Sequence, residues 1–177
     1  MRGSVSGTVA HLRAAMTRSL PQVERVVVLG CGGAGKSTFA LHLSQITRLP
    51  VIELDRHFWS DDLVPLPVDA WVKVQEELAA SDRWIMDGDL GPYDAPAVRL
   101  HRADTVVVLD LSLARCGWRA ARRSRERLDF WWWLLTWRWR WRILDAVDAH
   151  APLADLRVLR SPAQVGRFLA AAQTATT

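Results

Sequence analysis

Five short apolar runs rich in β-branched residues alternate along the chain with segments in which apolar residues recur at helical spacing. A short run that is apolar throughout is typical of a strand buried on both faces, whereas the helical spacing is typical of an amphipathic helix. The predicted strands are Arg25–Leu29, Pro50–Leu54, Arg83–Met86, Thr105–Leu109 and Leu156–Leu159. The predicted helices are Lys36–Thr47, Asp69–Ser81, Ser112–Arg127, Phe130–Ala149 and Pro162–Ala172. This alternation predicts an α/β fold in three layers, with a five-stranded parallel sheet covered by helices on both faces.

Polar residues and prolines mark the ends of these segments. Asp69 and Ser112 each precede a helical pattern and are predicted N-caps, because their side-chain oxygens can accept a hydrogen bond from the first turn. Val64–Pro67 is a predicted loop, since its two prolines disfavour both helix and strand. The length of 177 residues predicts one domain over residues 25–172, after a partly disordered extension at 1–24 and before a tail at 173–177, in which Thr174–Thr177 are expected to be disordered.

A glycine-rich segment joins the first predicted strand to the first predicted helix. It reads Gly30-Cys31-Gly32-Gly33-Ala34-Gly35-Lys36-Ser37 and matches the phosphate-binding loop G-x-x-x-x-G-K-[ST] in its required setting. The loop amides and the helix N-terminus can hold phosphate oxygens, Lys36 can reach the β- and γ-phosphates, and Ser37 can ligate Mg²⁺. A connecting turn would not require Lys-Ser at this spacing. The sequence therefore predicts a P-loop NTPase fold that binds ATP through Gly30, Gly32, Gly33, Ala34, Gly35, Lys36, Ser37 and Thr38.

Three acids follow predicted strands, where a parallel sheet places its ligand crevice. Asp110 comes directly after the fourth strand. It has two equally weighted interpretations: a Walker B acid that holds Mg²⁺ or its water shell, and a structural cap on the phosphate loop. Asp55, after the second strand, is interpreted as a contact to the acceptor or to a metal-bound water in preference to a helix N-cap, because it converges with the phosphate loop. Asp87 follows the third strand in the same way.

Nine arginines and two acids lie between Arg115 and Arg142, in a chain whose net charge is +4. This basic segment indicates an anionic ligand. Its second half, Trp131–Arg142, contains six of the ten tryptophans. Three interpretations stay open: a tryptophan stripe that packs on the sheet or on a second copy of the chain, a surface that stacks single-stranded nucleic acid, and a helix on a membrane surface. Packing or a homodimer is favoured, because helical aromatic stripes are more often buried.

Several segments, taken in order, carry a resemblance to a known family. After the phosphate loop come Glu53-Leu54-Asp55, Trp84–Gly88 and Arg99–Asp110, and the chain closes with Val158–Ser161. Over residues 25–170 the chain resembles the adenylate-kinase-like proteins called DNA topology modulation proteins. The resemblance implies a nucleoside-monophosphate-kinase-like fold, binding of ATP and Mg²⁺, and phosphotransferase activity.

The resemblance also implies roles for individual residues. Asp55, Asp87 and Gly88 would line the acceptor pocket, and Arg99 would lie near an acceptor phosphate. Arg119, Arg122 and Arg123 would belong to a lid helix that neutralises the transferring phosphoryl group, with Arg122 on the nucleotide. The implied catalytic residues are Lys36, Asp55, Asp87, Arg119 and Arg123, and the metal ligands are Ser37 and Asp110.

Two segments depart from the family pattern. The chain has Asp87-Gly88-Asp89 where the family has Asp-Gly-Asn, which adds a negative charge where an acceptor phosphate would approach. The basic helix also leads straight into Phe130–Trp133, without the family's polar loop of Gly, Lys and Pro.

The remaining features narrow the class of protein. Two scattered cysteines predict reduced thiols and no disulfide framework, and the lack of a long apolar run predicts no signal peptide or membrane span. Both features favour a cytoplasmic protein. We predict a phosphotransferase that moves the γ-phosphoryl group of Mg²⁺·ATP to a small acceptor, with a nucleotide favoured. The alternative is a nucleotide-dependent binding protein whose Trp/Arg helix attaches to nucleic acid or to a membrane surface.

Overall fold

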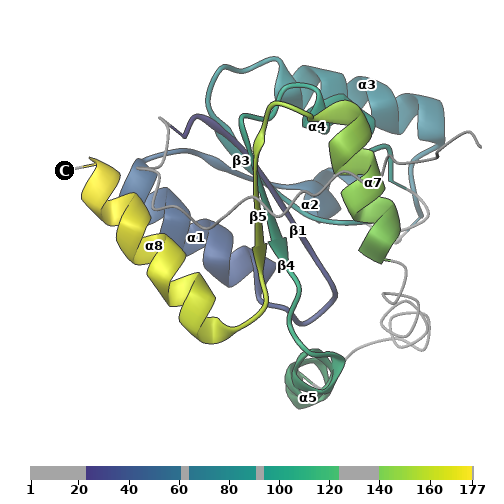
Figure 1. Cartoon of the computed structure of the whole chain (residues 1–177). Helices are drawn as coiled ribbons and strands as arrows, with labels where there is room; N and C mark the ends of the chain where they lie inside the picture. The colour runs from purple at the N-terminus through teal and green to yellow at the C-terminus, as the bar shows by residue number, and fades with distance from the viewer. Residues whose placement is uncertain (1–22, 61–63, 91–93, 124–139, 177) are drawn as a thin grey trace, which may run out of the picture.

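A computed structural model describes residues 23–60, 64–90, 94–123 and 140–176 of the chain. Its centre is a sheet of five parallel strands in the order β2-β3-β1-β4-β5 (Figure 1). The strands are β1 (Arg25–Gly30), β2 (Val51–Glu53), β3 (Trp84–Asp87), β4 (Thr105–Leu109) and β5 (Asp155–Leu159). The five predicted strands and their parallel arrangement are confirmed. Because β1 lies in the middle of the sheet, the phosphate loop that follows it is central too.

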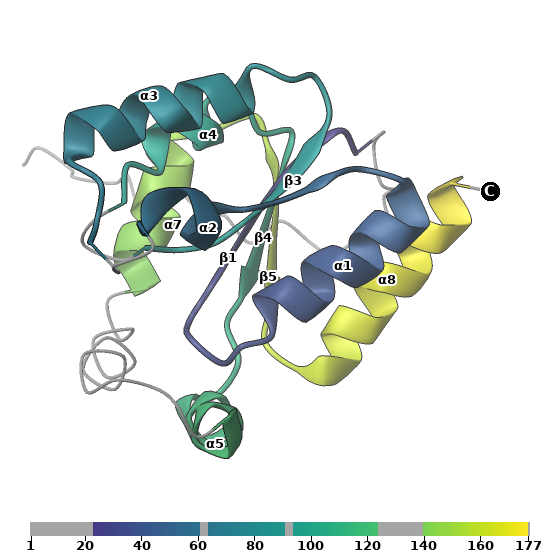
Figure 2. The same ribbon diagram turned by 180° about the vertical axis from the view of Figure 1, so that it is seen from behind.

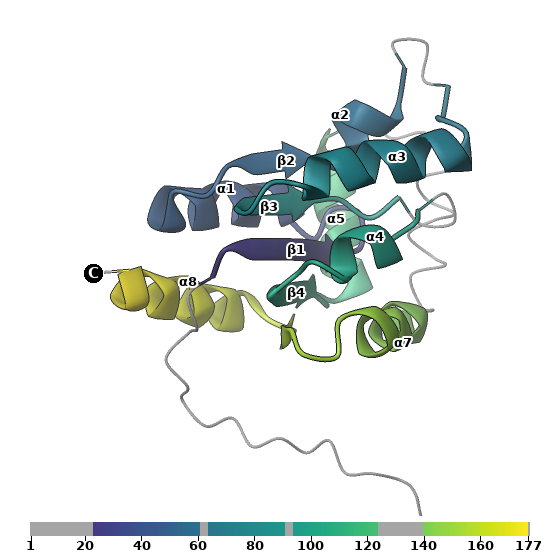
Figure 3. The same ribbon diagram turned by 90° about the horizontal axis from the view of Figure 1, so that it is seen from above.

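Helices cover both faces of this sheet, as Figures 1 and 2 show from opposite sides. The described helices are α1 (Lys36–Thr47), α2 (Leu54–Phe58), α3 (Val68–Ala79), α4 (Ala97–Leu100), α5 (Leu113–Arg123), α7 (Arg140–His150) and α8 (Pro162–Thr176). Helices α1 and α8 lie on one face, and α3, α4 and α7 lie on the other (Figure 3). The predicted three-layer architecture is therefore confirmed.

The side chains of β1 show why helices pack on both faces of the sheet. Val26 and Val28 belong to the core under α1 and α8, together with Phe39 and Phe168. Val27 and Leu29 point to the opposite face and join the core under α3, α4 and α7. Successive side chains of a strand alternate between the faces of a sheet, so a strand that is apolar throughout must be buried on both.

Some boundaries differ from the prediction. The N-cap of α3 is Pro67, and Asp69 lies in the first turn, where its charge favours the helix dipole without capping. Helix α8 continues to Thr176, so the predicted disordered tail is wrong up to that residue. The run of alanines there favours helix, and the hydroxyl of Thr176 donates to the carbonyl of Ala172. Helices α2 and α4 were not predicted, because four or five residues are too few to show a helical period.

The predicted Trp-rich helix Phe130–Ala149 is described only from Arg140 onward, as α7. Val147 of α7 is buried against the sheet, with Ile143 and Leu144 partly buried beside it. Trp131–Trp139 lie outside the described residues, so the interpretations of the tryptophan stripe stay predictions. None of the helices that the structure describes is long and apolar enough to cross a membrane.

Candidate functional site

The phosphate loop connects the central strand to α1 and requires glycine at specific points. Gly33 has φ of 76°, and a Cβ at this position would collide with the backbone carbonyl oxygen of Cys116 in α5. Gly35, with φ of 92°, is the N-cap of α1. Left-handed φ values of this kind favour glycine, which has no Cβ. The loop is thereby curled at the helix N-terminus and pressed against α5.

Lys36 lies folded over this loop. Its Nζ donates hydrogen bonds to the carbonyl oxygens of Gly30, at 2.7 Å, and Cys31, at 3.4 Å. Its positive charge also acts to lower the pKa of the Asp55 and Asp87 carboxyls. The Lys36 ammonium group thus binds the loop by hydrogen bonds and acts electrostatically on Asp55 and Asp87.

Asp87 ends β3, directly opposite Val28 in the register of β1. The residue is 5% exposed, and its Oδ1 has no hydrogen-bond partner among the described residues. Burial raises the pKa of this carboxyl, while a hydrogen bond from the Ser37 side chain and the charge of Lys36 act in the opposite direction. The structure therefore brings together Asp87 and the predicted metal ligand Ser37.

Asp110 lies on the other side of β1, after β4. Its backbone N–H donates to the carbonyl oxygen of Leu159, and its Oδ2 is 3.5 Å from Nε of Arg160. Its charge acts on Cys31 in the phosphate loop. Asp110 is thus close to the loop and paired with an arginine of the neighbouring β5 segment.

Asp55 is the second residue of α2, whose N-cap is Glu53, so the N-cap interpretation of Asp55 is wrong. The residue is exposed. Protein atoms around the carboxyl raise its pKa by desolvation, and Lys36 and a hydrogen bond from the Trp59 side chain lower it. Because the residue remains open to solvent, this desolvation carries little energy. Asp55 therefore presents an exposed carboxylate within electrostatic reach of Lys36.

Arg99 has a fully buried side chain. Its Nη1 donates to Gln75 Oε1 at 2.7 Å and to Asp94 Oδ1 at 2.8 Å, and its Nη2 donates to Asp94 Oδ2 at 2.6 Å and to the Gly88 carbonyl at 3.3 Å. Burial would lower the pKa of the guanidinium, but the charge and hydrogen bonds of Asp94 outweigh it and raise the pKa. Four terminal N–H groups thus bind protein acceptors at a position where the resemblance implied an acceptor phosphate.

Helix α5 contains the three predicted lid arginines, Arg119, Arg122 and Arg123. The structure does not describe their side chains. The start of α5 is attached to the phosphate loop through two buried thiols. The Sγ atoms of Cys31 and Cys116 are 2.9 Å apart, and neither residue has exposed surface. This contact joins the basic helix to the loop, and neither the number nor the spacing of the cysteines predicted it.

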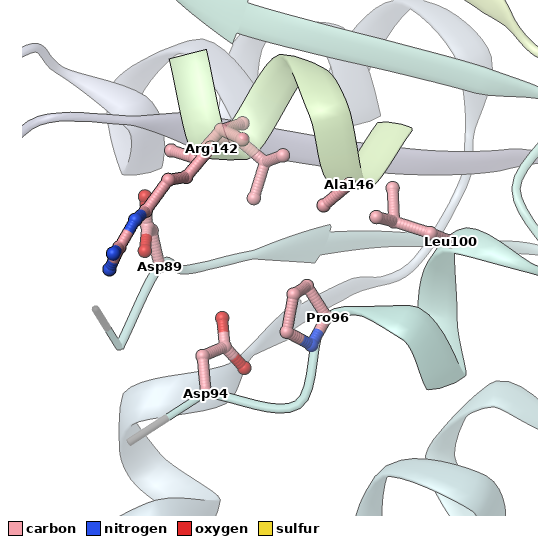
Figure 4. A pocket seen from close by; sticks show the side chains of 8 residues that line it. Asp89, Asp94, Pro96, Leu100, Arg142 and Ala146 are labelled. Atoms are coloured by element: carbon pink, nitrogen blue, oxygen red, sulfur yellow. The ribbon is translucent and has the colours of Figure 1, made fainter. Parts of the chain in front are cut away.

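A cavity of about 140 Å³ lies between the segment after β3 and helix α7 (Figure 4). Asp89, Asp94 and Arg142 give it charged walls, and Leu29, Leu100 and Ile143 contribute apolar ones. Leu29 directly precedes the phosphate loop, and Asp89 follows Asp87 by two residues. Sequence reasoning missed Asp94 and Arg142 as parts of this region.

A scan against protein-family models and a search of curated protein sequences both give no match. Similar solved structures exist. The fold is that of the P-loop kinases. A sugar kinase from a Janibacter species has a TM-score of 0.54 and 23% identity, over 88% of this chain and 99% of that one. The shikimate kinase of Acinetobacter baumannii, in complex with shikimate, has a TM-score of 0.59 and 16% identity, over 84% and 89%.

A gluconokinase from Sinorhizobium meliloti has a TM-score of 0.51 and 15% identity, over 86% of this chain and 91% of that one. Identities this low establish the fold and leave the activity to the site itself. The resemblance to DNA topology modulation proteins therefore stays a prediction.

Proposed function

We propose that the protein is a kinase that transfers the γ-phosphoryl group of Mg²⁺·ATP to a small acceptor. The observation that carries the proposal is a complete phosphate loop with Lys36 folded over it and the buried Asp87 beside Ser37. The fold supports it, because the similar structures are kinases named for sugars, shikimate and gluconate. In P-loop enzymes of this kind, catalysis is mostly positioning and neutralisation of charge.

The loop binds the triphosphate. In the structure, Lys36 Nζ donates to two loop carbonyl oxygens, at 2.7 and 3.4 Å. When nucleotide binds, its phosphate oxygens would replace these carbonyl oxygens as the acceptors. The loop amides and the N-terminus of α1 add partial positive charge. The lysine is thus held at the place where it is needed before the nucleotide arrives.

The residues around Asp87 fit a magnesium ion. The orphaned Oδ1 of Asp87 is a buried carboxylate oxygen without a partner among the described residues, and the Ser37 hydroxyl lies next to the same carboxyl. Mg²⁺ is commonly held by one or two protein oxygens together with phosphates and waters, and when bound it neutralises phosphate charge. We assign this role to Ser37 and Asp87 in preference to Asp110, because Asp110 is paired with Arg160.

Asp55 and the lid arginines complete the proposed machinery. The exposed Asp55 carboxylate would orient the acceptor hydroxyl and take its proton as the oxygen bonds to the γ-phosphorus and ADP leaves. Arg119, Arg122 and Arg123 would neutralise the phosphoryl group from α5, which contacts the loop through Cys116.

The test is release of ADP from Mg²⁺·ATP in the presence of a panel of small hydroxyl compounds, nucleosides and nucleoside monophosphates. We expect one class of compound to accelerate release. Lys36→Ala should abolish both ATP binding and release, and the chain's other lysine provides a matched control: Lys73→Ala, on the exposed face of α3, should retain both. A panel that leaves ADP release unchanged while ATP still binds contradicts the proposal and favours the nucleotide-dependent binding protein.

A further inference from the structure

We propose that His101 and His150 form a binding site for a divalent transition-metal ion, of the class of Zn²⁺ and Ni²⁺, that joins helix α4 to helix α7. The two imidazole rings are in edge-to-face contact, with centroids 4.9 Å apart and ring planes at 76° to each other. His101 is exposed and His150 is half-buried, so solvent reaches the pair. The two histidines lie far apart in the sequence, and no sequence motif marks them.

The strand register explains why these two side chains meet. His101 is the C-cap of α4 and precedes β4, whereas His150 is the last residue of α7 and precedes β5. The first residues of these strands, Thr105 and Asp155, are register partners, and the N–H of Asp155 donates to the carbonyl oxygen of Asp104 at 2.8 Å. Helices α4 and α7 also pack side by side (Figure 1). The backbone therefore holds the two histidines together.

The distance between the rings fits a shared metal ion. A metal bound to a ring nitrogen at about 2.0–2.1 Å lies about 3.2 Å from the ring centre, so two rings on one metal have centroids about 4.5–5.2 Å apart in right-angled or tetrahedral geometry. The observed 4.9 Å falls within this range. The last torsion of a histidine side chain has a broad energy well, so each ring can turn a nitrogen toward the ion. The pair therefore needs little rearrangement to bind a metal.

The donor set determines the class of metal. Imidazole nitrogen is a common ligand of Zn²⁺ and Ni²⁺, whereas Mg²⁺ and Ca²⁺ prefer oxygen ligands. In the described part of the chain, no third histidine, cysteine, aspartate or glutamate joins the pair, so water fills the other coordination positions. The C-terminal end of α7 adds partial negative charge beside His150, which favours a cation. Arg102, next to His101, donates to the carbonyl oxygen of Ala80 at 3.4 Å and so extends toward the end of α3.

This site is separate from the proposed nucleotide site. The phosphate loop follows the C-terminal end of β1, whereas the histidines precede the N-terminal ends of β4 and β5, and in a parallel sheet these ends lie at opposite edges. Leu100 of α4 and Ile143 and Ala146 of α7 line the cavity of about 140 Å³. A metal ion at the helix ends therefore ties two walls of this cavity together. The proposal stands or falls independently of the kinase function.

The test is isothermal titration of the full chain, without a histidine tag, with Ni²⁺ and with Zn²⁺ in excess Mg²⁺. Two of the four ligands of a structural zinc site supply about half of its binding free energy, so we expect one ion per chain with a Kd of about 1–200 µM. His101→Asn and His150→Asn should each weaken binding about tenfold or more. His42→Asn, which replaces an exposed histidine of α1, is the matched control and should bind as the unaltered chain does.

Thermal unfolding gives an independent readout. A ligand that binds only the folded chain raises the melting temperature, and Ni²⁺ at about ten times its Kd should raise it by about 3–6 °C. The shift should be absent in His101→Asn and present in His42→Asn. Because His101 is exposed, its replacement should leave the melting temperature without metal unchanged. Metal binding that is unchanged in His101→Asn, that Mg²⁺ displaces, or that is absent at about 1 mM metal overturns the inference and leaves the two rings as a packing contact only.

Discussion

The buried pair of Arg99 and Asp94 predicts a large and specific loss of stability in Asp94→Asn. The substitution keeps the size of the side chain but leaves a guanidinium charge at a site without solvent access. Breaking a buried ion pair by removal of one partner costs about 3–5 kcal/mol. For a chain of this length, each kcal/mol lowers the melting temperature by about 2–4 °C, so we expect a fall of about 6–20 °C.

The assay is thermal and urea unfolding, each followed by circular dichroism across the transition. The matched control is the exposed pair of Arg56 and Glu53, whose atoms are also close, at 3.0 Å, but whose side chains are 76% and 40% exposed. Glu53→Gln should cost less than about 1 kcal/mol, because solvent already screens an exposed pair. The contrast between the two pairs therefore measures burial, since both contain an arginine and an acid.

A double variant that removes both charges tests whether the loss in Asp94→Asn comes from the unpaired charge. Arg99→Met with Asp94→Leu removes both charges, so it should recover part of the loss seen in Asp94→Asn. Recovery should be incomplete, because Gln75 and the Gly88 carbonyl lose a donor. If Asp94→Asn proves as mild as Glu53→Gln, Arg99 is open to solvent and is available to an acceptor phosphate. That result would refute the description of Arg99 as a buried residue whose charge is balanced by Asp94.

Three further predictions follow from single contacts. Without Mg²⁺, Asp87→Asn should raise the free energy of unfolding at neutral pH, and kinase turnover should be lost. A carboxyl whose pKa is raised in the folded state favours folding at low pH, and this contribution is lost as the pH rises through the folded-state pKa. The stabilisation by Asp87→Asn should therefore disappear in acid. Gly33→Ala should weaken ATP binding and stability, whereas Gly166→Ala, which has open space in α8, should stabilise by up to about 1 kcal/mol in the same melts. The thiols of Cys31 and Cys116 should resist a chromogenic disulfide reagent until the protein is unfolded, because their mutual hydrogen bond and burial raise the pKa of Cys31; rapid labelling of the native protein would contradict the buried contact.

Elements with a strong local signal were predictable to the residue. Helix α1 begins at Lys36 because the phosphate motif itself specifies a helix N-terminus there, and it ends at Thr47 as its apolar period predicts. Strand β4 matches its apolar run Thr105–Leu109 in full. In both cases local preference and tertiary burial agree, which is the condition under which sequence patterns are reliable.

Long-range polar contacts were not predictable in the same way. The environment of Arg99 depends on α3, on the segment after β3 and on α4 at once, and no local pattern encodes that meeting. One signal was present: Gln75 lies between Trp71 and Ala79 on the buried stripe of α3, where every fourth residue faces the core. A polar residue on such a stripe must find a partner, so its position indicated a buried polar contact.

The contact between Asp94 and Arg99 argues against the role that the family resemblance implied for Arg99. An arginine at the right place in the chain was expected to bind an acceptor phosphate, yet a carboxylate five residues earlier already occupies its fork with two hydrogen bonds. A phosphate bound between the same two Nη atoms would need the donors that Asp94 already occupies. The Nε of Arg99 has no partner among the described residues, but it is buried, as is the rest of the side chain. Of the two other hydrogen bonds, one joins Arg99 to Gln75 in α3, and the other, to the Gly88 carbonyl, holds the turn between Asp87 and Asp89. Arg99 thus becomes a positioning residue for two carboxylates, one beside the phosphate loop and one in the cavity.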